Sequence, residues 1–127
     1  MESIRFIEPK DNVALAAVIR AALTEFGANK PGTVYFDPTT DNLSALFETP
    51  GSVYYVAEKD NEILGGCGIF PTVGLPDKTC ELVKLYLAPG SRGTGLGKAL
   101  MLKAMAWAKE AGYEQVYLET MPELSNA

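Results

Sequence analysis

The chain has 127 residues, of which 47% are hydrophobic and 21% charged, and its formal net charge is −5 with no histidine. This length and composition are typical of a single globular domain, which we expect to span residues 1–127. The acidic balance argues against nucleic-acid binding, and the lack of histidine excludes His-based triads and the usual zinc sites, so no metal is expected.

The first half of the chain predicts one strand and two helices. Residues 3–8 alternate in polarity and indicate a short strand. Asp11 or Asn12 is the expected cap of a helix that ends near Phe26. The loop over residues 29–40 contains Pro and Gly, and Thr40 or Asp41 is the expected cap of a second, shorter helix.

The second half predicts a hairpin, a third strand, a long helix and a last strand. Residues 52–58 and 62–70 form the hairpin around a turn at Asp60-Asn61, and the glycines of its second arm indicate a bulge or a close backbone approach. Residues 81–87 are almost continuously apolar and predict a central strand, and residues 114–119 predict the last one. The order β-α-α-β-β-β-α-β predicts an α/β (α+β) mixed sheet with helices on both faces.

The long helix follows a glycine-rich loop. Residues recur along it at intervals of three and four, as one face of an amphipathic helix. The residues expected on that face are Leu96, Ala99, Leu100, Lys103, Ala104, Trp107 and Ala111.

The loop itself, Arg92-Gly93-Thr94-Gly95-Leu96-Gly97-Lys98, is the strongest functional signal. A triphosphate-binding loop would need glycine at position 92 and a hydroxyl at position 99, where the chain has Arg and Ala. A dinucleotide fingerprint fails at its third small residue in both possible frames, although Glu119 lies about where a ribose-binding acid is expected. The dinucleotide interpretation therefore stays only as a lesser alternative.

Glycines at the start of a helix suit a diphosphate, because they let backbone N–H groups converge on one anion and the helix dipole adds to the attraction. Between Leu82 and Lys109 there is no Asp or Glu but there are five basic residues. Arg92 and Lys98 are expected to contact the anion, whereas Lys103 and Lys109 are expected on a solvated helix face.

The motif Arg92-x-x-Gly95-x-Gly97, together with ELVKLYLAP before it and YEQVYLET after it, resembles the acyl-CoA loop of the GNAT superfamily of acyl-CoA-dependent N-acetyltransferases. The resemblance covers essentially the whole chain. It implies acetyl-CoA as the co-substrate and direct attack of a primary amine, on a small molecule or peptide, on the thioester. Residues 92–98 would bind the diphosphate. The main chain of Leu85, Tyr86 and Leu87 would pair with the pantetheine arm, and the Leu87 amide would donate to the thioester carbonyl.

Glu81 corresponds by spacing to a glutamate that serves as general base in several members of the superfamily. A carboxylate is the natural proton acceptor in a chain without histidine. The competing interpretation is an ordinary solvated glutamate at a strand end.

The acceptor site is only weakly indicated. The resemblance points to Tyr35, Phe36 and Glu119 as residues near the acceptor, although loop aromatics more often cap a core. The acidic remainder of the chain would suit a cationic amine. A binding module that holds acyl-CoA without turnover is the main alternative to an enzyme.

The resemblance leaves the C-terminal part of the family's pattern unmatched, namely a helix with an Asn and a Tyr and two further strands. Asn126 cannot be assigned to that helix, no residue is assigned to protonate the thiolate, and Tyr86 and Tyr117 are expected to pack in strands. The last strand would then expose an edge, for which a second copy of the chain is a possible cover.

The location expected from the sequence is the cytoplasm. The N-terminus MESIRFIEPK has no signal-peptide pattern, and no apolar run approaches the roughly 20 residues of a membrane span. Cys67 and Cys80 lie in apolar, strand-like segments and are expected to be reduced core residues.

Overall fold

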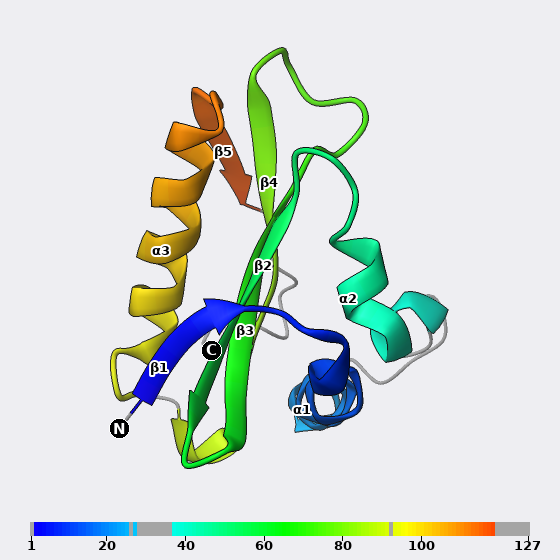
Figure 1. Ribbon diagram of the computed structural model, residues 1–127, viewed down its shortest axis with the longest axis vertical. Coiled ribbons are helices and arrows are strands. Elements are labelled where there is room, and N and C mark those ends of the chain that lie inside the picture. Colours follow the sequence, from blue (N-terminus) through cyan, green and yellow to red (C-terminus); the bar gives the residue numbers. More distant parts are fainter. Residues whose placement is uncertain (1, 26, 28–36, 92, 119–127) are drawn as a thin grey trace.

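The computed structural model describes residues 2–25, 27, 37–91 and 93–118 (Figure 1). Its five strands form one sheet in the order β1-β2-β3-β4-β5. Strands β1 to β4 are antiparallel neighbours, and β5 pairs with β4 in parallel. The strands are β1 (Glu2–Phe6), β2 (Val53–Lys59), β3 (Glu62–Phe70), β4 (Thr79–Leu87) and β5 (Gln115–Leu118).

The helices cover both faces of this sheet (Figure 1). One core cluster packs α3 against the sheet, and a second packs α1 and α2 against the opposite face. The α-helices are α1 (Asn12–Glu25), α2 (Leu43–Leu46) and α3 (Leu96–Glu110). Short 3-10 turns are η1 (Pro9–Asp11), η3 (Pro38–Asn42) and η4 (Pro89–Ser91). The predicted element order and mixed sheet are therefore confirmed.

Two predicted helix caps are wrong. Asp11 is buried and does not cap α1, because its carboxylate accepts hydrogen bonds at 2.8 Å from the Arg5 guanidinium and from the Glu8 N–H. Burial raises the pKa of Asp11, but these hydrogen bonds outweigh it and leave that pKa below its usual value. Before α2, Asp37 caps the η3 turn by accepting from the Thr39 N–H, in place of Thr40 or Asp41.

The face of α3 that packs on the sheet differs in part from the predicted one. Its buried residues repeat every fourth position, whereas Ala99 and Ala111 are exposed, and Lys103 is exposed as expected of a solvated lysine. The buried residues are Leu96, Leu100, Ala104 and Ala108, and the half-buried Met101 and Trp107 pack beside them. Gly112, at φ +100, ends the helix, as expected of a glycine in this place.

The hairpin and the cysteines follow the prediction. Asp60 and Asn61 have φ values of +52 and +66, which is the turn that matches the twist of two antiparallel strands. Cys67 and Cys80 are both buried and free, and burial raises the pKa of the Cys67 thiol to about 12. Both thiols are therefore inert core residues.

The glycines of β3 make room for a tyrosine that crosses the strand. A Cβ atom on Gly66 would lie 2.3 Å from the Tyr54 ring, and one on Gly68 would lie 2.8 Å from it. Tyr54 belongs to β2, is 1% exposed, and its hydroxyl donates to the Lys84 carbonyl of β4 at 2.8 Å. The glycines of β3 thus leave space for a side chain of β2 to form a hydrogen bond with the backbone of β4.

Replacing Gly66 with Ala is expected to lower the free energy of unfolding by about 2 kcal/mol, because the added methyl group overlaps a buried, hydrogen-bonded ring. Urea unfolding measures the change. Gly90→Ala is the matched control, since a Cβ atom there meets nothing within 4 Å. Equal unfolding midpoints for the two variants would show that Tyr54 does not need this space.

Candidate active site

The glycine-rich loop forms an open row of backbone amides at the start of α3. Gly93 and Gly95 have φ values of +76 and +86, a conformation that glycine adopts without strain. The Ser91 N–H donates to the Ala88 carbonyl at 2.9 Å, and the next backbone bond begins with the Ala99 N–H and the Gly95 carbonyl at 3.1 Å. Between them, none of the amides of residues 93–98 donates to a backbone carbonyl of the described chain.

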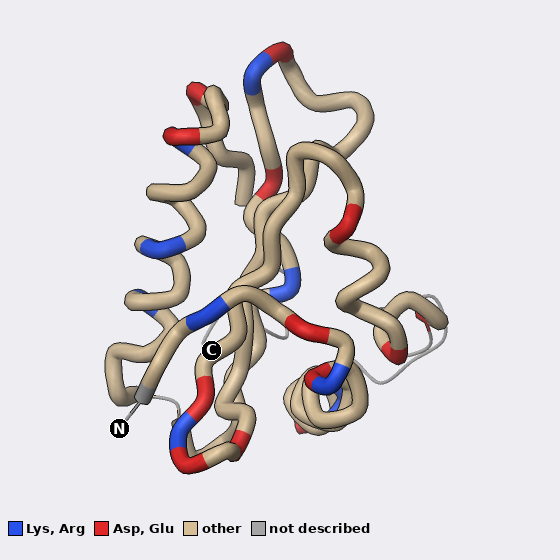
Figure 2. The backbone as a smooth tube through the Cα atoms, in the orientation of Figure 1, with Lys and Arg blue, Asp and Glu red and all other residues tan. Residues whose placement is uncertain are grey.

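The space in front of this row is free, and its charge favours an anion. A Cβ atom on Gly90, Gly93 or Gly95 would meet nothing within 4 Å. The first turn of α3 has no acidic residue, and Lys98 is exposed there. Figure 2 shows only basic residues along α3 until its last turn. The helix dipole, and amides that have no backbone acceptor among the described residues, therefore point to a site for a diphosphate.

The described part of β5 pairs with only the first part of β4. The two strands pair only from Thr79 with Gln115 to Leu82 with Leu118. From residue 83 to 87, β4 pairs with β3 but with no described residue of β5. Gly97 brings α3 close to the end of this segment, since a Cβ atom on it would lie 3.3 Å from the Leu87 side chain.

The three predicted pantetheine-binding residues lie in the second part of β4, beyond its pairing with the described part of β5. The side chain of Tyr86 is buried in the cluster with α1 and α2, whereas Leu85 and Leu87 pack on the α3 side. Their side chains thus belong to the core, so the predicted contacts with a ligand would have to use the main chain.

Glu81 is half-buried in β4, between two strands. Its Cα neighbours are Phe70 in β3 and Tyr117 in β5. The Thr72 hydroxyl donates to Glu81 Oε1 at 2.6 Å and holds the carboxylate in place. The competing interpretation, a freely solvated glutamate at a strand end, does not describe this position, because Glu81 is flanked on both sides and hydrogen-bonded.

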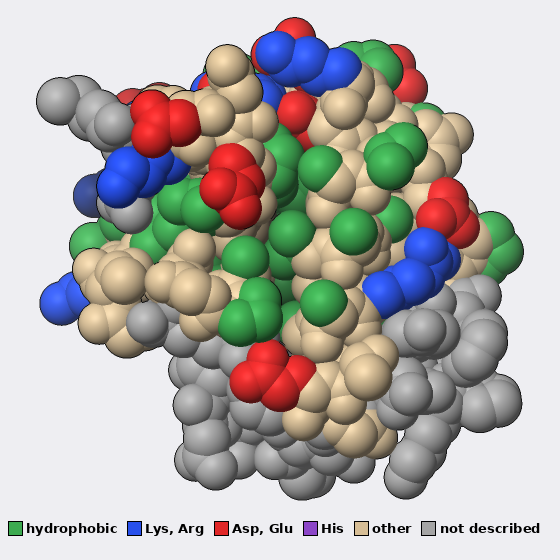
Figure 3. All heavy atoms as spheres, turned by 90° about the horizontal axis from the view of Figure 1, so that it is seen from below, with side chains coloured by type: hydrophobic (Ala, Val, Ile, Leu, Met, Phe, Trp, Pro, Cys, Tyr) green, Lys and Arg blue, Asp and Glu red, His purple; other side chains and the backbone are tan. Residues whose placement is uncertain are grey.

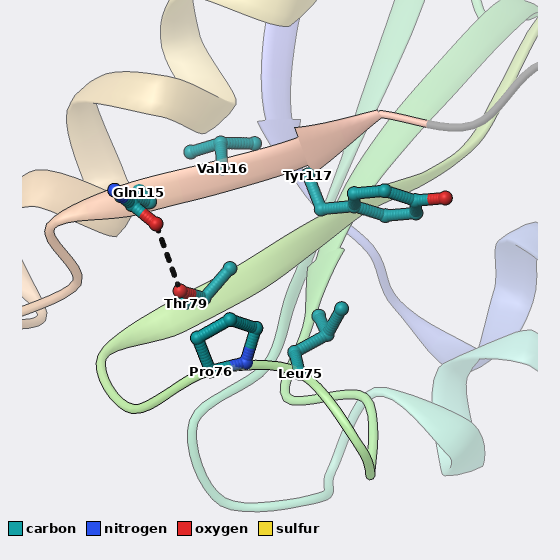
Figure 4. Close-up of a pocket in the computed structure, with 6 residues that line it drawn as sticks. All are labelled: Leu75, Pro76, Thr79, Gln115, Val116 and Tyr117. Carbon is teal, nitrogen blue, oxygen red and sulfur yellow. Dashed lines mark hydrogen bonds between the residues drawn. The ribbon is translucent and has the colours of Figure 1, made fainter.

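A shallow groove of about 430 Å³ opens beside β4 and β5 (Figure 4). Val116 points to the α3 side in Figure 4, whereas the Tyr117 ring lies on the other side with Leu75 and Pro76. Because Tyr117 and Glu81 are register partners in adjacent strands, their side chains share one face of the sheet. The groove therefore borders the candidate base. Its lining residues are Leu75, Pro76, Thr79, Gln115, Val116 and Tyr117.

The structure adds residues that the sequence did not indicate. Thr72 could not be singled out because nothing in the pattern marks a loop threonine as a partner of Glu81. Tyr117, expected to pack in its strand, is 44% exposed and lines the groove. The available signal was its place in the last predicted strand, which was expected from the sequence to expose an edge.

Several predicted site residues lie outside the described part of the chain. They are Arg92, Tyr35, Phe36, Glu119 and Asn126. The other members of the predicted phosphate seat are described and lie together from Gly93 to Lys98. The candidate site therefore consists of this loop, the second part of β4, and Glu81 with the neighbouring Tyr117.

Other classes of site find no support in the described residues. They contain no cluster of His, Cys, Asp and Glu side chains able to hold a metal ion. No described helix is both long and apolar enough to cross a bilayer. On the face seen in Figure 3, basic side chains lie in separate places with acidic ones beside them, so positive charge is not gathered there into one patch.

Comparison with known proteins identifies relatives of this chain. Residues 15–127 match the family described as Acetyltransferase (GNAT) family. The chain is 43% identical to the uncharacterised N-acetyltransferase YjgM of Escherichia coli K12, over 98% of this chain and 75% of that protein.

Solved structures share the fold. An acetyltransferase of the GNAT family from Staphylococcus aureus Mu50 superimposes with a TM-score of 0.82 at 21% identity, covering 98% of this chain and 77% of that one. The PaiA N-acetyltransferase of Thermoplasma acidophilum, solved in complex with coenzyme A, gives a TM-score of 0.76 at 20% identity and covers 98% of this chain and 82% of its own.

Proposed function

Because the chain belongs to the GNAT family of acetyltransferases, we propose that it transfers the acetyl group of acetyl-CoA to a primary amine that attacks the thioester directly. The observation that carries the proposal is the row of amides from Gly93 to Lys98 at the start of α3, which have no backbone acceptor among the described residues and include two glycines, Gly93 and Gly95, with no packed neighbour. The coenzyme A bound to the PaiA relative supports the same class of ligand.

Each part of the site has a proposed role. The amides of residues 93–98, together with Lys98 and Arg92, bind the diphosphate. The main chain of Leu85 to Leu87 pairs with the pantetheine arm, and the Leu87 amide keeps the role that the resemblance gives it, as donor to the thioester carbonyl. Acetyl-CoA supplies an acyl group with a good leaving thiolate.

Glu81 is the proposed general base. Its carboxylate accepts the proton that the acceptor's amine loses as the nitrogen bonds to the acetyl carbon and the carbon–sulfur bond breaks. The bond from Thr72 fixes one carboxylate oxygen, so the other is left to receive the proton. The groove that Tyr117 lines beside Glu81 is the proposed approach for the acceptor.

Two measurements test the proposed function. Thermal unfolding is followed with coenzyme A, acetyl-CoA and NAD, and thiol release from acetyl-CoA is then followed with a panel of amines. We expect stabilisation by coenzyme A and acetyl-CoA but not by NAD, and thiol release with at least one amine. Stabilisation without thiol release would favour the non-catalytic binding module, and stabilisation by NAD alone would favour the dinucleotide alternative.

The predictions of a homodimer over the exposed face of β5 and of a cytoplasmic location stay predictions. The exposed Tyr117 and Leu118 support the first, and the two free buried cysteines support the second.

A further inference from the structure

Lys84 occupies an irregular position in the middle of β4. In the pairing with β3, Gly66 faces Tyr86 and Gly68 faces Val83, so that two residues of β4 oppose one of β3. This is a β-bulge, and within it Lys84 has φ +53. A left-handed backbone costs a residue with a long side chain about 1–2 kcal/mol, and glycine would avoid this cost.

The fold holds the bulge in place from a distance. The buried Tyr54 donates its hydroxyl to the Lys84 carbonyl at 2.8 Å, and the glycines of β3 leave it the space to do so. A strained conformation that the surrounding structure maintains in this way is typical of a functional site, where it aims a side chain in a required direction.

The Lys84 side chain is half-buried and lies in no salt bridge with any described residue. Burial lowers the pKa of Lys84, against the opposing influence of the Asp37 and Glu81 carboxylates. Both carboxylates are near enough for their charges to act on the ammonium, yet each already accepts hydrogen bonds, Asp37 from Thr39 and Glu81 from Thr72. The ammonium is thus partly desolvated, within electrostatic reach of the proposed base, and in no salt bridge with any described residue.

We propose that the Lys84 ammonium binds a carboxylate of the acceptor, so that this enzyme acetylates amines that also carry a carboxylate group. The inference rests on the proposed function, because it places the acceptor's amine at Glu81. Lys84 lies three residues further along the same bulged strand, so one small molecule can reach both groups. An incoming carboxylate would offset the desolvation of the ammonium, whereas a purely cationic acceptor would meet a like charge. This refines the expectation of a simple cationic amine.

The test uses pairs of acceptors that differ only in this group, an amino acid and its carboxamide with the same side chain. In the wild type we expect kcat/KM to be at least about tenfold higher for the acid, equivalent to one charge-assisted hydrogen bond. Lys84→Met is expected to abolish this preference for the acid by raising the KM of the acid, while the KM of acetyl-CoA stays unchanged. Lys84→Arg is expected to keep part of the preference. Lys103→Met, which removes an exposed lysine of α3, is the control and should keep the wild-type preference.

Binding of products gives a readout that does not require turnover. The N-acetyl amino acid is expected to raise the melting temperature of the wild type more than its carboxamide does, and Lys84→Met is expected to lose this difference. Lys84→Gly removes the ammonium while relieving the positive φ, so it serves as the second variant if Lys84→Met fails to fold.

The outcomes separate this inference from the proposed function. Two results would contradict the inference: acetylation of amines by the wild type without a preference for the acid, or a preference that survives in Lys84→Met. Either result would show that Lys84 does not bind the acceptor's carboxylate, while the proposed acetyltransferase function would be retained. If no amine yields thiol, the proposed function fails, and the product-binding comparison alone decides whether Lys84 holds a carboxylate.

Discussion

Replacing Glu81 with Gln is expected to lower kcat for amine acetylation about 100-fold near neutral pH, which is the usual contribution of a general base. Gln keeps the size of the side chain and an oxygen that accepts from the Thr72 hydroxyl, so the local structure is retained. What is lost is the ability to accept a proton. Steady-state thiol release measures the effect, and calorimetry with acetyl-CoA is expected to give an unchanged Kd.

Glu62→Gln is the matched control for this substitution. Glu62 is an exposed glutamate at the start of β3, so the same chemical change there should leave kcat within about twofold of the wild type. Turnover by Glu81→Gln equal to that of Glu62→Gln would remove Glu81 from the mechanism. Equal losses in kcat and in acetyl-CoA affinity would instead indicate a structural role for Glu81.

Replacing Gly93 with Asp is expected to weaken acetyl-CoA binding about 100-fold, or about 2.7 kcal/mol, because it sets a carboxylate in the row of amides proposed to hold the diphosphate. The stability of the fold should change little in comparison. A Cβ atom at Gly93 meets nothing within 4 Å, and an acidic residue near the start of a helix is favourable for that helix.

Gly93→Asn separates charge from backbone strain. Asn and Asp have the same size and tolerate the positive φ of Gly93 about equally well, so both variants carry the same conformational cost. We expect the Asn variant to bind acetyl-CoA within about tenfold of the wild type. If the Asp variant binds as well as the Asn variant, the diphosphate does not lie at this loop. Calorimetry, with thermal unfolding of the free proteins alongside, makes the comparison.

The conformation of Lys84 depends on packing in the core of the fold. The glycines of β3 allow Tyr54 to reach the carbonyl of Lys84, and the bulge that results lies on the strand that also carries Glu81. A substitution such as Gly66→Ala is therefore expected to disturb the site as well as the core. The geometry of the site on β4 thus depends on side-chain packing that involves β2, β3 and β4.

The sequence by itself determined those features in which the interacting residues are neighbours in the chain. The Asp60-Asn61 turn, the order of the elements and the row of amides before α3 all arise within a few consecutive residues. For this reason the proposed phosphate-binding loop from Gly93 to Lys98 could be inferred from the sequence: the glycines, the helix start and the absence of acids are local properties.

The tertiary structure decided what depends on strand register and on loops that fold back. Tyr54 and Lys84 are 30 residues apart, and they meet only because β3 lies between their strands with glycines at the crossing. Asp11 meets Arg5 and not the first turn of α1, since β1 brings the guanidinium to it. Thr72 reaches Glu81, and Tyr117 lies open beside it, through the pairing of β4 with both neighbours. A shift of one residue in that pairing would turn each of these side chains to the other face, and local sequence pattern does not specify the register.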